Sequence, residues 1–277
     1  MSKKDVINYY NETAMLWLKY YGSNIQVFKL KDDINCVKTL NYLNKKLNIQ
    51  ENDLIFDVGC GIAAASIYFA KKIKNTKYLG ITISPRQVEI AKKFIKDENL
   101  EKRISVYEKD YHNIPKNIKG FDKAFLFESL CYSDNINLAI KQINKAIKPN
   151  GVIVIKDLFL NKKLSEVKKQ ELKALNIFKN IYKMQILSDI DGIKKLLTNK
   201  GFKDIEIEIL DHKEWDISQY YDSMMDITCE EVLGGKIPKL NPLGIKHVYT
   251  KENGNPALHV EHLPLTWAII KAKKNNK

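Results

Sequence analysis

Short apolar runs alternate with amphipathic segments through most of the chain. Residues 52–58 (NDLIFDV) contain an apolar run of the kind that forms a buried parallel strand. Residues 33–48 instead space apolar side chains three and four positions apart, as a helix does. Repeated in turn, the two patterns predict βαβ units and therefore a parallel sheet. The expected strands are 52–58, 77–83, 104–110, 121–129, 152–159, 203–210 and 265–274, and the expected helices are 4–21, 33–48, 62–74, 84–98, 135–147 and 189–202.

The pattern changes after residue 160. Residues 164–187 read as one long helix or two shorter ones, inserted before the next sheet element, and 217–233 read as a further helix. Residues 148–151 (KPNG) predict a turn. Because repeats and low-complexity linkers are absent from the sequence, we expect one α/β domain with a doubly wound, mostly parallel sheet of seven strands.

Composition limits the class of protein. A chain of 277 residues with 44% hydrophobic residues can bury a full core. No apolar run approaches the ~20 residues that cross a membrane, and the first residues lack the apolar centre of a secretory signal. The four cysteines lack metal or disulfide spacing, which predicts a cytoplasmic location; they are Cys36, Cys60, Cys131 and Cys229.

The net charge of +13 suggests nucleic acid at first sight. All the basic residues except Arg86 and Arg103 are lysines, however, and the chain is rich in Asn and Ile, as expected from an AT-rich genome. Base readout favours the planar arginine fork, so we expect no nucleic-acid partner. An anionic small substrate remains compatible with the charge.

A glycine pair follows the strand at 52–58. Gly59 and Gly61 flank Cys60, and a helical pattern begins at once, which is the layout that brings backbone close to a nucleotide or nucleoside. The third glycine of a dinucleotide motif is missing. The sequence D-V-G-C-G resembles the first motif of class I methyltransferases that use S-adenosylmethionine. That resemblance places the methionine end of the cofactor over Gly59, Cys60 and Gly61, with Asp57 holding the turn or, through water, the ammonium group. A Rossmann dehydrogenase is the alternative.

Residues 80–93 (GITISPRQVEIAKK) resemble one subgroup of these enzymes, which includes cyclopropane fatty acid synthases, tocopherol and sarcosine methyltransferases, and terpenoid C-methyltransferases. Most class I enzymes end the second strand with an acidic residue that binds the ribose hydroxyls. Here Thr82, Ser84 and Gln87 stand near that place, and hydroxyl and amide groups can form the same hydrogen bonds. The alternative is a well-capped helix start without a ligand, with Ser84 as N-cap and Pro85 in the first turn.

A third match lies in residues 108–115 (EKDYHNIP), which resemble the adenine-binding corner of the family. The resemblance implies that Asp110 accepts from the adenine amino group and that Tyr111 packs beside the ring, although a surface turn can look similar. The matches run in order through residues 52–160. They imply a Rossmann-like methyltransferase sheet divided into a helical cap (1–50), a cofactor-binding core (51–160) and substrate-side helices with the last strands (161–277).

Glu128 ends the fourth expected strand, where acceptor-side residues of such a fold gather. Methylation of an alkene creates a carbocation, and a carboxylate near aromatic rings can both stabilise and deprotonate it. The E-S-x-x-Y pattern ending at Tyr132 resembles geranyl and isopentenyl diphosphate C-methyltransferases, and sterol methyltransferases also carry a Glu here. We therefore expect Glu128 and Tyr132 to be catalytic, and the Tyr9–Tyr10 pair to cover the cofactor as in related enzymes. Glu128 also counts among the cofactor-contacting residues, with Tyr10.

Several alternatives remain open. Glu128 can cap the following helix or pair with a lysine, or hold the ammonium of an amine substrate. Cys131 is a conceivable nucleophile, although a packing thiol is the simpler interpretation. A non-catalytic protein on this fold, or an RNA methyltransferase, is a further possibility. A magnesium ion would be needed only with a diphosphate acceptor, and no protein metal site is expected.

Two aromatic segments lie outside the core pattern. The first precedes residue 30, and the second, at 214–227, suits either an apolar acceptor pocket or packing on the sheet. His259 and His262, with Glu261 between them, lack a convincing third ligand for a metal. The aromatic and Met residues concerned are Trp17, Tyr20, Tyr21, Trp215, Tyr220, Tyr221, Met224 and Met225.

Overall fold

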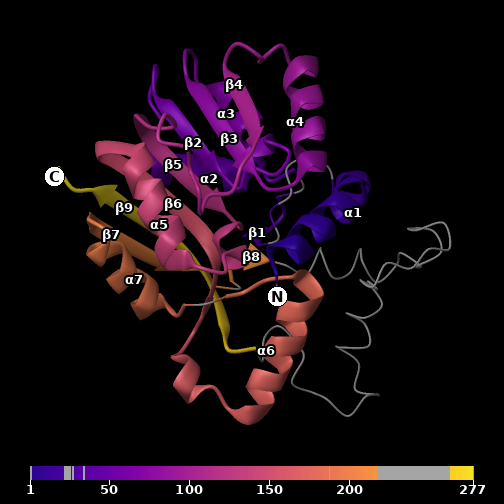
Figure 1. Cartoon of the computed structure of the whole chain (residues 1–277), viewed down its shortest axis with the longest axis vertical. Coiled ribbons are helices and arrows are strands. Elements are labelled where there is room, and N and C mark those ends of the chain that lie inside the picture. Colours follow the sequence, from indigo (N-terminus) through magenta and orange to yellow (C-terminus); the bar gives the residue numbers. More distant parts are fainter. Residues whose placement is uncertain are drawn as a thin grey trace.

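One seven-stranded sheet organises the computed structural model (Figure 1), which describes residues 2–21, 26, 28–33, 35–186, 188–211, 213–216 and 263–276. All neighbouring strands pair in parallel except β9, which runs antiparallel to both of its neighbours. The mostly parallel, doubly wound sheet expected from the sequence is confirmed. Its order is β4 (Ile104–Glu108), β3 (Lys77–Thr82), β2 (Leu54–Val58), β5 (Phe121–Phe127), β6 (Ile147–Leu160), β9 (Leu265–Lys274) and β7 (Phe202–Ile209).

Helices cover both faces of the sheet, and each face has its own core cluster. The apolar sides of α2, α3 and α4 pack on one face, and those of α5 and α7 pack on the other. Helix α1 packs against α4 near the end of the sheet where α4 begins (Figure 1). The helices are α1 (Lys3–Tyr21), α2 (Val37–Leu47), α3 (Ala64–Lys72), α4 (Pro85–Asp97), α5 (Ile136–Ala146) and α7 (Ile190–Asn199).

The start of β6 differs from the expected turn at 148–151. The strand begins at Ile147, which pairs with Phe121, and the register shifts before Lys123 pairs with Val152. Asn150 has a φ of 61°, so the turn residues are absorbed as an irregularity within the strand. A turn-like composition therefore produced a bulged strand because the neighbouring strand continued to pair.

Between β6 and α7 the chain forms a short 3₁₀ segment, η2 (Leu164–Glu166), and the helix α6 (Lys169–Tyr182), so the expected insertion consists of two pieces. A small sheet that the sequence did not predict pairs β1 (Lys29–Leu30) with β8 (Trp215–Asp216). The helix expected at 217–233 lies outside the described residues. Among the described helices, none combines the length and apolar character that a membrane span requires.

Candidate active site

The glycine turn after β2 is closed by the neighbouring strand and by the loop after β5. The backbone N–H groups of Gly59 and Cys60 both donate to the carbonyl of Ile81, at 2.9 Å each. Gly59 has a φ of +78°, and a Cβ at this position would lie 2.4 Å from the Cβ of Ser129. Gly59 is therefore required by the close approach of two loops of this protein, whatever binds above them.

The side chains of Cys60 and Asp57 anchor the glycine turn to the neighbouring strand and helix. A Cβ on Gly80 would lie 2.9 Å from the Sγ of Cys60, so the absent side chain of Gly80 makes room for this thiol. The buried carboxylate of Asp57 accepts a 2.6 Å hydrogen bond from Ser66 in α3, and burial raises the pKa of Asp57 to about 7. The expectation that Asp57 holds the turn fits this contact, and a bond to a cofactor ammonium stays a prediction.

The start of α4 lies beside this turn. Thr82 donates to the side-chain oxygen of Gln87 at 2.6 Å, and a Cβ on Gly61 would lie 3.7 Å from the amide nitrogen of Gln87. Ser84 caps the helix by accepting from the backbone N–H of Gln87, and its hydroxyl donates to Asn11 of α1 at 2.7 Å. The Gln87 amide thus lies beside the glycine turn and is held by Thr82, whereas the hydroxyl of Ser84 bonds to the helix start and to Asn11.

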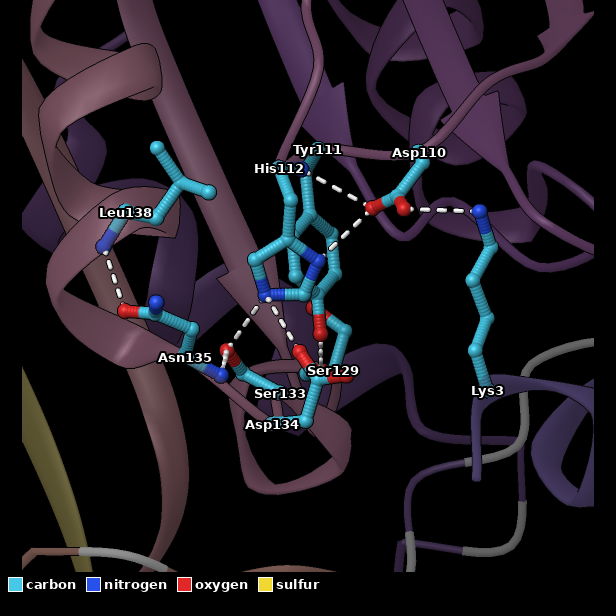
Figure 2. Close-up of polar contacts among 9 residues, drawn as sticks. All are labelled: Lys3, Asp110, Tyr111, His112, Ser129, Ser133, Asp134, Asn135 and Leu138. Carbon is cyan, nitrogen blue, oxygen red and sulfur yellow. Dashed lines mark hydrogen bonds and ion pairs between the residues drawn. The ribbon is translucent and has the colours of Figure 1, made fainter.

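The segment after β4 forms a polar network around His112 (Figure 2). The ring nitrogen Nδ1 of His112 lies 2.8 Å from Asp110, and Nε2 lies 2.8 Å from the hydroxyl of Ser133. Asp110 also accepts from the backbone of His112 and pairs with Lys3 of α1 at 2.8 Å. Burial acts to raise the pKa of Asp110, but the bonds from His112 and Lys3 outweigh it and hold the pKa below the usual range.

Tyr111 lies in the core beneath this network. Its hydroxyl donates to the carbonyl of Ser129 at 3.1 Å, and the residue is 8% exposed. This bond joins the segment after β4 to the loop after β5 (Figure 2). Packing of Tyr111 beside an adenine ring stays a prediction, because the contacts that the structure describes are with the protein's own core.

The loop after β5 begins at Glu128 in a left-handed conformation with a φ of 57°, which costs a non-glycine residue about 1–2 kcal/mol. The Glu128 carboxylate forms an ion pair with the ammonium of Lys156 and accepts from the backbone of Phe28 at 3.4 Å. Of the alternatives left open by the sequence, pairing with a lysine is therefore the one observed. The side chain of Glu128 retains 10% exposure, whereas that of Lys156 has none.

Asp157, the residue after Lys156 in β6, holds the other side of the same loop. Its fully buried carboxylate accepts from the backbone N–H of Leu130 at 2.6 Å and from that of Cys131 at 3.2 Å. Burial raises the pKa of Asp157 to about 6. Burial also raises the pKa of the Cys131 thiol well above its usual value, which favours a packing role over nucleophilic catalysis.

Aromatic rings from α1 reach the loop after β5. The ring of Tyr10 lies edge-on to that of Tyr132, with centroids 5.3 Å apart, and Tyr9 lies edge-on to Tyr10 at 5.1 Å. These contacts bring the Tyr9–Tyr10 pair to the loop after β5, and the expectation that the pair covers the cofactor stays a prediction. Burial raises the pKa of Tyr10 and of Tyr132 well above the usual value, so both phenols stay neutral.

Trp215 belongs to a buried aromatic stack, which settles its two interpretations in favour of packing. It stacks on Phe28 with centroids 6.0 Å apart, and Phe28 stacks on Trp267 at 5.3 Å. The other residues proposed in the same segment, and the histidine pair near residue 260, lie outside the described residues. They are Tyr220, Tyr221, Met224, Met225, His259, Glu261 and His262.

Four residues at this site were not predicted: Asn11, His112, Lys156 and Asp157. A signal for two of them was present, because Lys156 and Asp157 interrupt an apolar strand that is otherwise suited to burial. Asn11 and His112 carried none, because Ser84 and Ser133, to which they bond, lie 73 and 21 residues away in sequence. Within the described residues, no three His, Cys, Asp or Glu side chains are grouped as a metal site would require.

The strand order, with one antiparallel strand beside the last, and the glycine turn after β2 define a class I methyltransferase fold. Residues 49–192 match the family described as a methyltransferase domain, which is more than half of the chain. The chain therefore belongs to the methyltransferase domain family.

Curated relatives include a sterol 4-C-methyltransferase of Caenorhabditis elegans, 26% identical over 174 residues (61% of this chain and 52% of the relative). The sterol 24-C-methyltransferase of Saccharomyces cerevisiae is 24% identical over 221 residues (77% and 57%). The chain thus matches little more than half the length of these relatives.

Solved structures with the same fold include the geranyl diphosphate C-methyltransferase of Streptomyces coelicolor A3(2), with a TM-score of 0.70 and 12% identity (98% of this chain and 97% of that one). The [4+2]-cyclase SpnF has a TM-score of 0.71 and 17% identity (100% and 97%). One fold therefore carries different chemistries, so the reaction has to be argued from the site.

Proposed function

We propose that this protein binds S-adenosylmethionine and transfers its methyl group to a small-molecule acceptor. The observation that carries the proposal is the meeting of three features at the carboxyl ends of parallel strands. They are the glycine turn, the Gln87 amide that lies beside it and is bonded to Thr82, and the buried acid Asp57 in the strand that leads into the turn. Ligands bind at this edge of doubly wound sheets, and membership of the methyltransferase family supports this cofactor.

The residues present fit this cofactor. Gly61 offers backbone without a side chain next to the Gln87 amide, and Gln87 and Thr82 can bond ribose hydroxyls. Asp57 supplies an acid suited to a cationic amino-acid end, and Asp110 an acceptor for an adenine amino group. The bound cofactor supplies a methyl group that is already activated for transfer, so the protein has to position the acceptor, exclude water and take up a proton.

For the acceptor, we propose a carbon atom of an alkene, such as that of an isoprenoid. Methyl transfer then leaves a carbocation, and Glu128 takes a neighbouring proton to restore the double bond. A carboxylate paired with lysine is a weak base, which suffices for a carbocation because its neighbouring protons are strongly acidic. The ring of Tyr10, which interacts electrostatically with Glu128, and the Tyr132 ring that it contacts would stabilise the cation. The names of the sterol and geranyl diphosphate relatives are consistent with this class.

An amine acceptor is the second candidate, favoured by the carboxylate that Glu128 presents at the site. An ammonium-bearing substrate would, however, approach an acid whose charge is already balanced by Lys156. A diphosphate acceptor would require further cationic groups and a magnesium ion in solution. A non-catalytic role and RNA methylation remain alternatives for the test below.

The first test measures cofactor binding and methyl transfer separately. Isothermal titration with S-adenosylhomocysteine should give micromolar affinity or better, whereas NAD should not bind. Transfer of a tritiated methyl group should then be screened against prenyl diphosphates, sterol precursors, quinones, small amines and RNA. Binding without transfer to any acceptor would support a non-catalytic role, and failure to bind would overturn the proposal.

The second test separates the carbon acceptor from the amine. Glu128→Gln should lower turnover roughly 100-fold or more on an alkene acceptor, because a general base is lost, and leave cofactor affinity nearly unchanged. With an amine that arrives neutral, the loss should be modest and lie mainly in acceptor affinity. Because Gln leaves Lys156 buried without its counter-ion, the double variant Glu128→Gln/Lys156→Met serves as the stability control. Near-normal turnover of Glu128→Gln would exclude the carbon mechanism.

A further inference from the structure

Lys156 is a fully buried lysine in the middle of a sheet, which is costly unless its charge is compensated. Its ammonium pairs with Glu128, donates to the side-chain oxygen of Gln26 at 3.1 Å, and lies 5.4 Å from the ring centre of Trp267. Since Lys156 has no exposed surface, it cannot itself touch a substrate. Glu128 is the member of the pair that keeps some exposure, so any effect of Lys156 on chemistry has to pass through Glu128.

Lys156 holds Glu128 at two points. The carbonyl of Lys156 accepts the backbone N–H of Glu128 at 2.7 Å, and its ammonium binds the carboxylate of the same residue. Glu128 adopts a left-handed φ of 57°, a conformation that persists in a non-glycine residue only when its surroundings enforce it. One residue of β6 thus fixes both the backbone turn and the direction of the carboxylate.

Other titratable groups surround the ion pair of Glu128 and Lys156. Three of these groups interact electrostatically with Glu128. They are Asp157 in β6, Cys131 in the loop after β5, and Tyr10 of α1. Asp157 carries negative charge when ionised, and Cys131 and Tyr10 are neutral at ordinary pH, so none of these three groups supplies a positive charge beside Glu128. Within the part of the chain that the structure describes, the cation that forms an ion pair with Glu128 is Lys156.

We propose that Lys156 is a positioning residue that keeps the Glu128 carboxylate charged and aimed at the acceptor, and that the pair disfavours an acceptor that carries a positive charge. This inference rests on the proposed role of Glu128 as base. When Glu128 takes the proton that the methylated carbocation loses, the C–H electron pair forms the new double bond and the carboxylate becomes neutral. Lys156 is then buried without a counter-ion, which favours release of the proton to solvent and restores the pair for the next turnover.

The ionisation of Glu128 can be measured without an acceptor. Infrared difference spectra between the wild type and Glu128→Gln isolate the carboxylate and carboxylic acid bands of Glu128 as pH is varied. For the Lys156→Met background, the difference spectrum is taken against Lys156→Met/Glu128→Gln. As the pH is lowered, the carboxylate band should disappear in this background at a pH at least one unit higher than in the wild type. Lys156→Arg, which retains the positive charge, is the matched control and should keep the wild-type transition.

A far-UV circular dichroism spectrum and a cooperative thermal transition like those of the wild type show that each variant is folded. If Lys156→Met does not fold, Lys156→Gln provides the same comparison, since its amide can still donate to Glu128. A carboxylate band that persists in the charge-free variant over the wild-type pH range would overturn the role of Lys156. This outcome is independent of methyl transfer, so it is distinguishable from failure of the proposed function.

Kinetics then test the consequence for turnover. On the acceptor that the tritium screen identifies, Lys156→Met should lower kcat roughly tenfold or more and move the acidic limb of the pH profile upward. The KM for the cofactor should change little, and Lys156→Arg should keep the wild-type limb. If Lys156→Met retains the wild-type kcat and pH profile on an alkene, the positioning role of Lys156 is wrong. If the acceptor is an ammonium-bearing amine, the proposed discrimination against positively charged acceptors is wrong.

Discussion

Gly59 and Gly61 occupy similar places in one turn but differ in what surrounds them. A side chain on Gly59 would collide with Ser129, whereas one on Gly61 would meet the Gln87 amide at an ordinary contact distance. The sequence suggests that bulk at Gly59, as in Gly59→Val, removes cofactor binding by colliding with the ligand. The geometry assigns that collision to the protein itself, so Gly61 is the position that reports on the ligand.

We predict opposite outcomes for two alanine variants. Gly59→Ala should lower the free energy of unfolding by roughly 1–3 kcal/mol, because the loop after β5 must shift. Gly61→Ala should cost only about 1 kcal/mol for its left-handed backbone, yet weaken S-adenosylhomocysteine binding tenfold or more. Urea unfolding and isothermal titration measure the two effects. Normal affinity in Gly61→Ala would separate this turn from the cofactor.

Asp57 gives a second prediction at the residue scale. Burial raises its pKa to about 7, so between about pH 4 and pH 7 the folded protein keeps a proton that the unfolded chain releases. The stability due to this proton is complete below about pH 4 and is lost as the pH rises through 7. Asp57→Asn stays neutral, so its free energy of unfolding relative to wild type should increase over this range, by on the order of 1.4 kcal/mol per pH unit. A relative stability that is constant with pH in urea titrations would contradict the prediction.

The local structure of the first motifs could be predicted because the residues that form it are close together in sequence. The glycine turn, the Ser84 cap and the Thr82–Gln87 neighbourhood all lie within a few residues of a strand end. Lys156 could not be paired with Glu128 from the sequence, because their contact depends on the register between β5 and β6. The same register brings Asp157 to the N–H groups of Leu130 and Cys131.

At the scale of elements, α1 contacts three separate parts of the site. Lys3 pairs with Asp110, Tyr10 lies against Tyr132, and Asn11 accepts from Ser84. The sequence indicated the aromatic residues of this helix but not its polar contacts. Among the strands, the run 265–274 was placed correctly, whereas β1 and β8 escaped prediction because two-residue strands carry no periodic signal.

Weakening one contact of α1 should affect ligand retention. Asn11→Ala leaves the buried Ser84 hydroxyl without its acceptor, which costs about 1–3 kcal/mol and loosens the helix against α4. We expect S-adenosylhomocysteine to dissociate several-fold faster in stopped-flow measurements. Lys4→Ala is the control, because Lys4 is an exposed residue of the same helix. Equal dissociation rates in wild type and Asn11→Ala would show that α1 does not retain the ligand.

At the scale of the whole molecule, the charge of +13 does not translate into arginine surfaces suited to nucleic acid. Arg103 is committed to the fold, because its guanidinium donates to the carbonyls of Ala70 and Ile73 at the end of α3. Arg86 pairs with Glu89 on the surface of α4. The absence of a nucleic-acid partner stays a prediction, and a gel-shift affinity with a steep salt dependence would contradict it.

The global stability of the protein should report which nucleoside the sheet binds. A ligand that binds only the folded state at 100 times its Kd adds about 2.7 kcal/mol to the free energy of unfolding. For a chain of this size, S-adenosylhomocysteine should therefore raise the Tm by roughly 5 °C. NAD at the same concentration should leave the Tm unchanged, since the turn lacks the third glycine of a dinucleotide site. Gly61→Ala should reduce the shift in proportion to its lost affinity, whereas Lys4→Ala, at an exposed residue of α1, should retain it. A thermal response to NAD in place of S-adenosylhomocysteine would mean that the glycine turn serves a dinucleotide and that methyl transfer is the wrong chemistry for this site.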